Sequence, residues 1–254
     1  MITPTRRNSK PSERRALILA NGSAPGRDRL PAGTLENIVL VIAADGGLRT
    51  AEALGLRPDL AIGDFDSADP ALLAKAEAEG VTMARVAAEK DESDLELAVR
   101  AAVARGATSI VILGALGGAR VEHTLAAIAL LGLGADSVTG SASPFEMAIV
   151  DERSTIRLLR GGTPGGRAAA IDLQGEPGDY VSLQPWGGDA AGVTTEGLRY
   201  PLRDEALVMG PSRGLSNELL GRHGRVSCRT GQLLVIHTRR AAVEAARISR
   251  EVSS

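Results

Sequence analysis

The sequence has few of the residues that build disulfide-stabilised or zinc-stabilised folds. Its single cysteine, Cys228, cannot form an internal disulfide, and one cysteine with three histidines cannot supply a Cys/His zinc set. A low cysteine count is typical of proteins in reducing compartments, so a cytoplasmic location is expected.

Long apolar runs and an excess of one sign of charge are also missing. The longest apolar stretch, Leu125 to Leu133, falls far short of the roughly 20 residues that span a bilayer. The run from Ala16 to Ala20, after the basic opening, is too short for the core of a signal peptide. Because 29 Lys and Arg face 31 Asp and Glu, the net charge is −2, and neither a membrane nor a nucleic acid is expected as a partner.

Aromatic residues form only 2% of the 254-residue chain, so Ala, Leu, Val and Ile must build the core. Between about Arg15 and Leu133, short apolar runs alternate with Ala- and Leu-rich segments, a pattern typical of βα units on a parallel sheet. Asp69 before Pro70 predicts a helix N-cap, and Ser93 with Glu96 predicts a capping box. The predicted strands are Ala16–Ala20, Val39–Ala43, Leu60–Ile62, Val81–Val86 and Ile110–Leu113, and the predicted helices are Leu48–Leu54, Pro70–Glu79, Leu95–Arg105 and one after His123.

The pattern changes within about ten residues of Phe145, where helical periodicity gives way to short β runs broken by Gly, Pro and Asp. We therefore predict an α/β fold in which a Rossmann-like parallel-sheet domain at residues 14–144 precedes an all-β sandwich at residues 145–240. Residues 1–13 are predicted to be a disordered tail, and residues 241–254 a tail or short helix.

Carboxylates and glycines gather where the predicted strands end. In open parallel sheets, ligands bind at the carboxyl ends of the strands, so these loops are the candidate site. The loops are Asp45-Gly46-Gly47, Gly63-Asp64-Phe65-Asp66-Ser67, Lys90-Asp91-Glu92-Ser93-Asp94 and Gly117-Gly118-Ala119-Arg120.

Asp64 and Asp66 stand two apart in an extended segment, so they project to one side and could offer two hard oxygen ligands to one ion. With Asp94 from the neighbouring loop, they suggest a Mg²⁺ site completed by water and substrate phosphates. Loop aspartates more often cap helices or make turns, but Asp69 already serves as the cap here. For Asp94 the alternative stays open, because a carboxylate in the first turn of a helix is favoured by the helix dipole.

The glycine pairs suggest phosphate binding. Gly46-Gly47 would let backbone N–H groups approach a ligand, and Gly117-Gly118 is followed by Arg120, whose guanidinium can hold a phosphate bidentately. Neither a Walker sequence nor a G-x-G-x-x-G fingerprint stands at a strand end, which disfavours a P-loop NTPase or a dehydrogenase. His123 could act as a base, although a histidine that opens a helix more often bonds locally.

In order and spacing, these four loops resemble the signature blocks of the thiamine pyrophosphokinase family, and Asn21 after the first strand fits as well. Two segments of the second half, Thr194–Tyr200 and Gly214–Glu218, look like the thiamine-side motifs of that family. The resemblance extends over roughly residues 16–238.

The resemblance implies transfer of a diphosphoryl group from ATP to thiamine with Mg²⁺, by a homodimer whose sites are completed across the interface. It implies metal binding by Asp64, Asp66 and Asp94, catalytic roles for Asp66, Asp94, Arg120 and Glu122, and thiamine binding by Thr195, Ser216 and Asn217. The implied nucleotide-binding residues are Asn21, Asp45, Gly46, Gly47, Lys90, Asp91, Ser93, Gly117, Gly118 and Arg120.

Two positions depart from the family pattern: Glu122 stands where the family usually has Asp, and Ala119 where many relatives have Gly or Arg. Two other functions stay open. A related pyrophosphokinase could act on a hydroxymethyl-pterin, although the Ser216-Asn217-Glu218 motif disfavours it. A non-catalytic sensor of thiamine or a nucleotide would bind its ligand without forming AMP.

Overall fold

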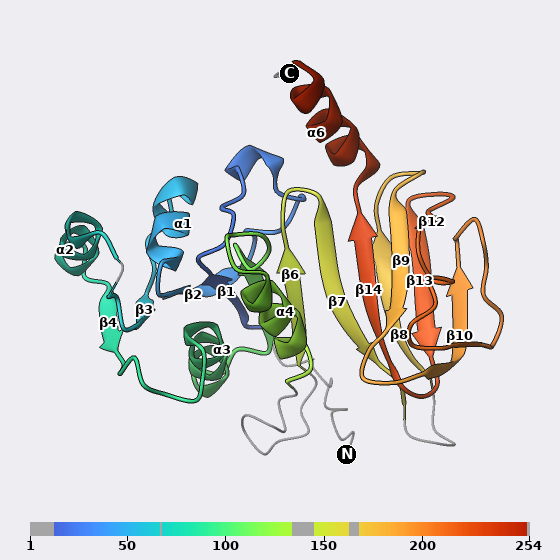
Figure 1. Ribbon diagram of the computed structural model, residues 1–254, viewed down its shortest axis with the longest axis horizontal. Helices are drawn as coiled ribbons and strands as arrows, with labels where there is room; N and C mark the ends of the chain where they lie inside the picture. The colour runs from blue at the N-terminus through green and yellow to red at the C-terminus, as the bar shows by residue number, and fades with distance from the viewer. Residues whose placement is uncertain (1–12, 67, 134–144, 163–167, 253–254) are drawn as a thin grey trace, which may run out of the picture.

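One ten-stranded sheet extends through the whole molecule, with helices on both faces of one half and a second, four-stranded sheet packed on the other half (Figure 1). The computed structural model describes residues 13–66, 68–133, 145–162 and 168–252. Most of the predicted N-terminal tail lies outside these residues, and so do Ser67 and the chain just before the predicted boundary at 144/145.

Six strands form the parallel part of the long sheet, in the order β6-β5-β1-β2-β3-β4. They are β1 (Arg15–Leu19), β2 (Ile38–Ala44), β3 (Leu60–Gly63), β4 (Thr82–Arg85), β5 (Ser109–Leu113) and β6 (Glu146–Val150). Because β1 lies between β2 and β5, the strand order reverses at the β1–β5 pair, and such a switch point is where α/β sheets bind their ligands.

The helices cover the two faces of this parallel part. They are α1 (Gly47–Leu54), α2 (Pro70–Ala78), α3 (Asp94–Ala104) and α4 (Val121–Leu130), with a short 3₁₀ helix, η1 (Arg27–Arg29). Alternate residues of β1 face opposite ways: Leu17 and Leu19 pack with α1, whereas Ile18 packs with α3. Both predicted N-caps are confirmed, since Asp69 accepts the N–H of Ala71 at 2.8 Å and Ser93 accepts that of Glu96 at 3.2 Å. The other half of the predicted capping box is replaced, because the Glu96 carboxylate accepts from Arg100 instead, at 2.7 Å.

The predicted sandwich is confirmed. Four antiparallel strands continue the long sheet: β7 (Ser154–Arg160), β14 (Gln232–Thr238), β9 (Tyr180–Pro185) and β12 (Asn217–Glu218). The facing sheet contains β11 (Glu205–Leu207), β10 (Ala190–Glu196), β13 (His223–Cys228) and β8 (Ala169–Gln174). Leu183 and Val235 of the first sheet meet Val193 and Val226 of the second in one buried core. The thiol of Cys228 is buried in this core.

The two halves share one ladder of strands. β6 pairs in parallel with β5 and antiparallel with β7, and the turn between β6 and β7 is tight. In that turn, Asp151 Oδ1 accepts the N–H groups of Arg153 at 2.7 Å and Ser154 at 2.6 Å. The strand after the predicted boundary therefore continues the parallel sheet, and the division at 144/145 stays a prediction.

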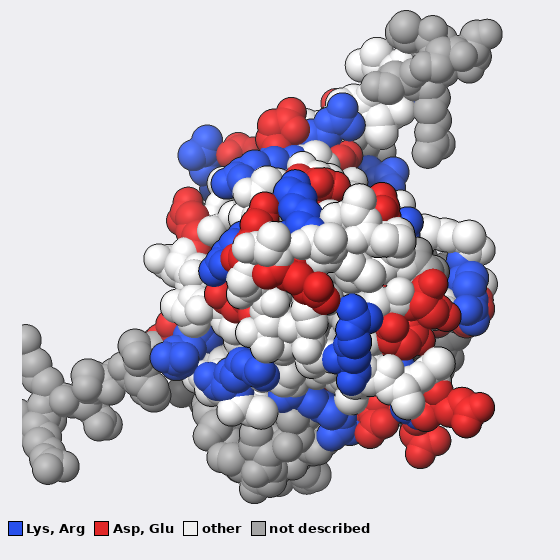
Figure 2. Space-filling model, turned by 90° about the vertical axis from the view of Figure 1, so that its left-hand side faces the viewer, with Lys and Arg blue, Asp and Glu red and all other residues white. Residues whose placement is uncertain are grey.

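The surface carries both signs of charge. On the face at the β4 edge of the molecule, Lys and Arg side chains are interspersed with Asp and Glu (Figure 2). Among the described residues, no helix has both the length and the apolar character needed to cross a membrane.

The last helix, α6 (Arg240–Val252), extends from the end of the sandwich (Figure 1). Its start is held by Asp179, which accepts hydrogen bonds from the backbone N–H groups of Arg240 at 2.9 Å and Glu176 at 3.0 Å, and pairs with His237 at 3.0 Å. Burial alone would raise the pKa of Asp179, but these bonds outweigh it and lower that pKa below its ordinary value. Asp179 is thus a buried anion with most of its acceptor capacity in use.

We expect Asp179→Asn to lower the free energy of unfolding by about 1–3 kcal/mol at pH 7, because an amide cannot accept all three bonds. A depressed pKa stabilises the fold above the unfolded-state value of about 3.9, and this contribution disappears as pH falls through the folded-state pKa. The difference between wild type and variant in urea unfolding should therefore be constant above about pH 5 and shrink below pH 4. The exposed Asp28→Asn is the control, and equal stability of both variants at pH 7 would contradict the role of Asp179.

Candidate functional site

A cavity of about 600 Å³ opens at the carboxyl ends of β1, β2 and β5, at the point where the strand order reverses. It is lined by predicted site residues from four separate segments: Asn21 after β1, Asp45 after β2, Lys90, Ser93 and Asp94 at the start of α3, and Gly117, Gly118 and Arg120 after β5. The sheet therefore brings together eight of the residues that the sequence nominated for nucleotide binding or metal binding.

The turn after β2 has a strained backbone. Asp45 adopts a positive φ of 46°, which is uncommon outside glycine, and α1 begins directly after it. A Cβ on Gly46 would lie 2.2 Å from the side chain of Asn21, and one on Gly47 would lie 1.9 Å from the carbonyl oxygen of Leu19. These glycines, predicted to let a ligand approach the backbone, are required here because α1 packs directly against the end of β1.

Arg49 is a cavity residue that the sequence reasoning missed. It stands in the first turn of α1, lines the cavity, and donates from Nη2 to Asn21 Oδ1 at 2.6 Å. A basic residue two positions after the Gly46-Gly47 pair, at the start of a helix, was the available signal. His123 also lines the cavity, on the side of α4.

Four aspartates lie near one another at this end of the sheet; Asp45 and Asp94 line the cavity, whereas Asp64 and Asp66 do not. Burial raises the pKa of Asp45 above its ordinary value, and a hydrogen bond with the backbone of Gly46 offsets part of that rise. The negative charges of Asp94, Asp64 and Asp66 raise the same pKa further. Asp45 Oδ1 is buried without a hydrogen-bond partner, so this oxygen is available to a cation or a donor.

The donor set fits a hard divalent cation, since it consists of carboxylate oxygens with one buried oxygen unpaired. A hydrogen bond within the loop after β3 orients the side chain of Asp64: the backbone N–H of Asp66 donates to Asp64 Oδ1 at 3.2 Å. Across the described parts of the chain, no group of three or more His, Cys, Asp or Glu is arranged to hold a metal ion by itself. Such a site suits Mg²⁺, which commonly binds one or two carboxylates together with waters and substrate phosphates.

Two basic residues of the site, Lys90 and Arg120, are paired with acidic neighbours. Lys90 Nζ lies 3.1 Å from Asp94 Oδ1, an ion pair without hydrogen-bond geometry, and donates to the carbonyl of Ala87 at 3.0 Å. Arg120 Nε donates to Glu122 Oε1 at 2.7 Å, and this bond lowers the pKa of Glu122. Both of these side chains are exposed. Glu122 is outside the cavity lining, as is the exposed Asp91.

The three residues predicted to bind thiamine lie in the sandwich, and none of them lines the cavity. Thr195 is buried, and its Oγ1 accepts the N–H of Leu202 at 2.8 Å. The side chain of Asn217 forms two hydrogen bonds with the backbone of Tyr200, accepting its N–H at 3.0 Å and donating to its carbonyl at 2.7 Å. Ser216 is exposed and has a positive φ of 59°. In the single chain, Thr195 and Asn217 therefore order loops, and Ser216 is the most accessible of the three.

Two family models match the chain, one for each half. A model described as the thiamin pyrophosphokinase catalytic domain matches residues 32–136, which contain most of the cavity. A model described as the thiamin pyrophosphokinase vitamin B1 binding domain matches residues 169–233, which contain most of the sandwich.

Whole-chain similarity points the same way. A thiamine pyrophosphokinase from Bacillus subtilis is 30% identical over 206 residues, which are 81% of this chain and 90% of that protein. The crystal structure of thiamine pyrophosphokinase from Bacillus subtilis aligns with a TM-score of 0.73 and 27% identity, over 89% of this chain and 99% of that one. The yeast thiamin pyrophosphokinase structure, at 15% identity, shares the fold with a TM-score of 0.68 over 90% of this chain and 87% of its own.

We expect Gly47→Ala to lower the free energy of unfolding by about 1–3 kcal/mol, because its Cβ would overlap the carbonyl oxygen of Leu19 and push α1 away from β1. For a chain of this size, that corresponds to a fall in Tm of about 3–10 °C by differential scanning calorimetry. Gly221→Ala is the matched control, because nothing lies within 4 Å of the added Cβ. A Gly47→Ala protein as stable as the control would show that α1 does not pack as described.

Proposed function

The chain belongs to the thiamin pyrophosphokinase family, and from this premise we propose that it transfers the terminal diphosphoryl group of ATP to thiamine, giving thiamine diphosphate and AMP. The observation that carries the proposal is the coincidence of the catalytic-domain match with a cavity at the switch point of the sheet. That cavity contains the positively and negatively charged side chains that binding of a nucleoside triphosphate and its metal ion requires.

The reaction requires attack at the β-phosphorus of ATP. The hydroxyl oxygen of thiamine forms a bond to this phosphorus, the bond from it to the oxygen bridging to the α-phosphorus breaks, and AMP leaves with that oxygen. The hydroxyl proton is released. Negative charge develops on the departing oxygen and persists on the diphosphoryl group, so positive groups placed around the phosphates should contribute most of the rate enhancement.

In the proposed mechanism, side chains of the cavity hold and orient the phosphates. Arg49 of α1 and Arg120, which precedes α4, both line the cavity, and Lys90 adds a third positive charge. Glu122 acts on Arg120 through their hydrogen bond and thereby restricts where the guanidinium points. Gly117 and Gly118, both with positive φ, keep the loop after β5 free of side chains where the nucleotide would lie.

We further propose that Asp64, Asp66 and Asp94, with Asp45 beside them, hold Mg²⁺ together with water and the phosphates of ATP, because the carboxylates are not arranged to hold an ion by themselves. When bound, the ion would neutralise phosphate charge and polarise the phosphoryl oxygens. Without a cation, four neighbouring carboxylates would repel the phosphates of ATP; burial, and after it the negative charges of the other three aspartates, raises the pKa of Asp45.

The thiamine site and the assembly are also proposals. The predicted division assigns residues 14–144 to the nucleotide and residues 145–240 to thiamine, yet Ser216 does not line the nucleotide cavity of its own chain. Large apolar side chains are exposed near it, with Tyr200 62%, Leu215 48% and Leu220 64% exposed. We propose a homodimer in which this surface of one chain, including Ser216, faces the nucleotide cavity of the other. The cytoplasmic location stays a prediction from the cysteine count.

The other two functions gain no support. A pterin-directed relative would be expected to differ in the substrate-binding half, whereas the vitamin B1 binding model matches residues 169–233. No feature of the described residues favours a sensor over an enzyme.

The direct test is to incubate the purified protein with ATP, thiamine and Mg²⁺ and to detect AMP and thiamine diphosphate by mass spectrometry. We expect both products in equal amounts, and Asp66→Asn should reduce kcat/KM by about 100-fold or more because it removes a charged ligand from the metal site. Asp69→Asn is the matched control: it makes the same change three residues away, and asparagine caps a helix as well as aspartate does.

Formation of AMP with a hydroxymethyl-pterin and none with thiamine would contradict the proposal that thiamine is the substrate. Binding of thiamine without AMP formation would favour a sensor. Equal activity of the Asp66→Asn and Asp69→Asn proteins would contradict the metal assignment.

The shared site is tested by mixing two inactive variants. Asp66→Asn disables the metal side, whereas Ser216→Arg places a bulky positive group on the exposed thiamine side, where it would repel the cationic substrate. If each site uses both chains, a 1:1 mixture that exchanges subunits should recover about a quarter of wild-type activity, since half of the dimers carry one intact site. An inactive mixture, despite subunit exchange confirmed by native mass spectrometry, would show that each chain supplies its own complete site.

A further inference from the structure

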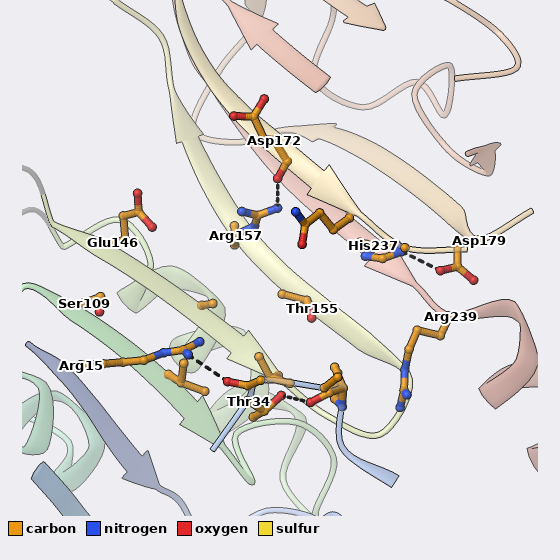
Figure 3. A pocket seen from close by; sticks show the side chains of 18 of the residues that line it. Arg15, Thr34, Ser109, Glu146, Thr155, Arg157, Asp172, Asp179, His237 and Arg239 are labelled. Atoms are coloured by element: carbon orange, nitrogen blue, oxygen red, sulfur yellow. Dashed lines mark hydrogen bonds and ion pairs between the residues drawn. The ribbon is translucent and has the colours of Figure 1, made fainter. Parts of the chain in front are cut away.

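A second and larger cavity, of about 940 Å³, lies elsewhere in the molecule (Figure 3). Its floor is the central sheet, and its side walls come from the 31–34 loop on one side and from β8 and the turn before β9 on the other. The residues that line it are entirely different from those that line the nucleotide cavity.

Strand register places the charged floor residues on one face of the sheet. Arg15 of β1 is paired with Ser109 of β5, and Ser109 with Glu146 of β6. Arg157 of β7 is opposite Ala148, which lies two residues from Glu146 and so points to the same side. Leu17 of β1 points to this same face, and α1 covers the face there. The helix α3 packs on the opposite face of the sheet. The cavity therefore occupies the part of the sheet between the helical layer and the sandwich.

Three arginines of the cavity are bonded to neutral groups. Arg15 donates to the carbonyl of Gly33 at 3.0 Å and Arg157 to that of Asp172 at 2.9 Å, as Figure 3 shows. Arg239 donates from Nη2 to the carbonyls of Arg29 and Glu152, and its Nε is buried without a hydrogen-bond partner. A carbonyl orients a guanidinium without cancelling its charge, so these positive charges remain available to an anion.

Most of the nearby carboxylates are already engaged. Asp179 is bonded to His237 at 3.0 Å, and Asp172 forms an ion pair with Arg225. Glu13 accepts a hydrogen bond from Ser109 at 3.0 Å. Burial lowers the pKa of Arg157 even though Glu146 and Asp172 act to raise it, so nearby negative charge does not compensate for the loss of water around this guanidinium.

We propose that this cavity is a second small-molecule site, and that it binds an organic phosphate through Arg15, Arg157 and Arg239. Guanidinium groups hold phosphates bidentately, and three of them match the charge of a diphosphate better than that of a single carboxylate. A cavity volume of about 940 Å³ is typical of pockets that bind organic ligands and is far larger than inorganic phosphate needs. The proposal goes beyond diphosphoryl transfer, since this site shares no lining residue with the nucleotide cavity.

Hydrogen–deuterium exchange of the full-length protein, measured by mass spectrometry, can locate binding without relying on activity. ADP and thiamine diphosphate serve as separate probes, because the proposed reaction does not reveal which class of organic phosphate fits the cavity. At least one of them should slow exchange in residues 146–160 and 169–180, and Arg157→Gln should raise the half-saturating concentration for that protection at least tenfold. Arg15→Gln should do the same, which guards against a folding defect in either variant.

The controls separate the two cavities. Arg160→Gln changes the same strand on its other face, where Arg160 bonds the carbonyl of Leu131, and Arg120→Gln changes the nucleotide cavity; neither should affect protection at 146–160. The absence of protection with both probes, protection unchanged by Arg157→Gln, or equal protection by inorganic phosphate would each overturn the proposal. Protection without AMP formation would support the second site and contradict the proposed diphosphoryl transfer. AMP formation without protection would support the transfer and contradict the second site.

Discussion

The pairing of β1 with β5 positions the nucleotide cavity. These strands are consecutive in space but far apart along the chain, and their five paired positions bring the loops after them together. Backbone bonds continue past the strands, from the N–H of Gly22 to the carbonyl of Gly114 at 2.6 Å and from Ser23 to Leu116 at 3.1 Å. A Cβ on Gly22 would lie 2.4 Å from that carbonyl oxygen, so glycine is required where the loops meet. Asn21 and the Gly117–Arg120 loop face one cavity because this contact is so close.

The same arrangement brings together negative charges that would lie far apart in the unfolded chain. The carboxylates of Asp45, Asp64, Asp66 and Asp94 come from three loops, and the negative charges of the other three add to burial in raising the pKa of Asp45. Their position at the end of a buried sheet is therefore explained better by ligand binding than by stability. The sandwich differs in this respect, since Asp179 forms three hydrogen bonds and supports the fold itself.

Local patterns predicted most of the elements, because apolar alternation and helix caps act over a few residues. Asp69 and Ser93 cap helices as expected, and Asp45 and Asp94, from two of the strand-end loops, line one cavity. The sequence reasoning missed β10, because Gly192 with its positive φ breaks the alternation. It also missed the continuity of the sheet through β5, β6 and β7, which depends on pairing between segments. The structural bonds of Thr195 and Asn217 could not be foreseen either, since motif likeness does not show which way a side chain points.

The unbroken ladder through β6 has a mechanical consequence. Two-domain enzymes often close on their substrates by bending about a flexible linker, but here the parallel half and the sandwich are joined by hydrogen bonds on both edges of β6 and by the tight turn at Asp151. Bending at this point would break the ladder. The chain should move as one rigid unit, so any opening and closing around a substrate would have to come from loop movement or, in the proposed homodimer, from movement of one subunit against the other.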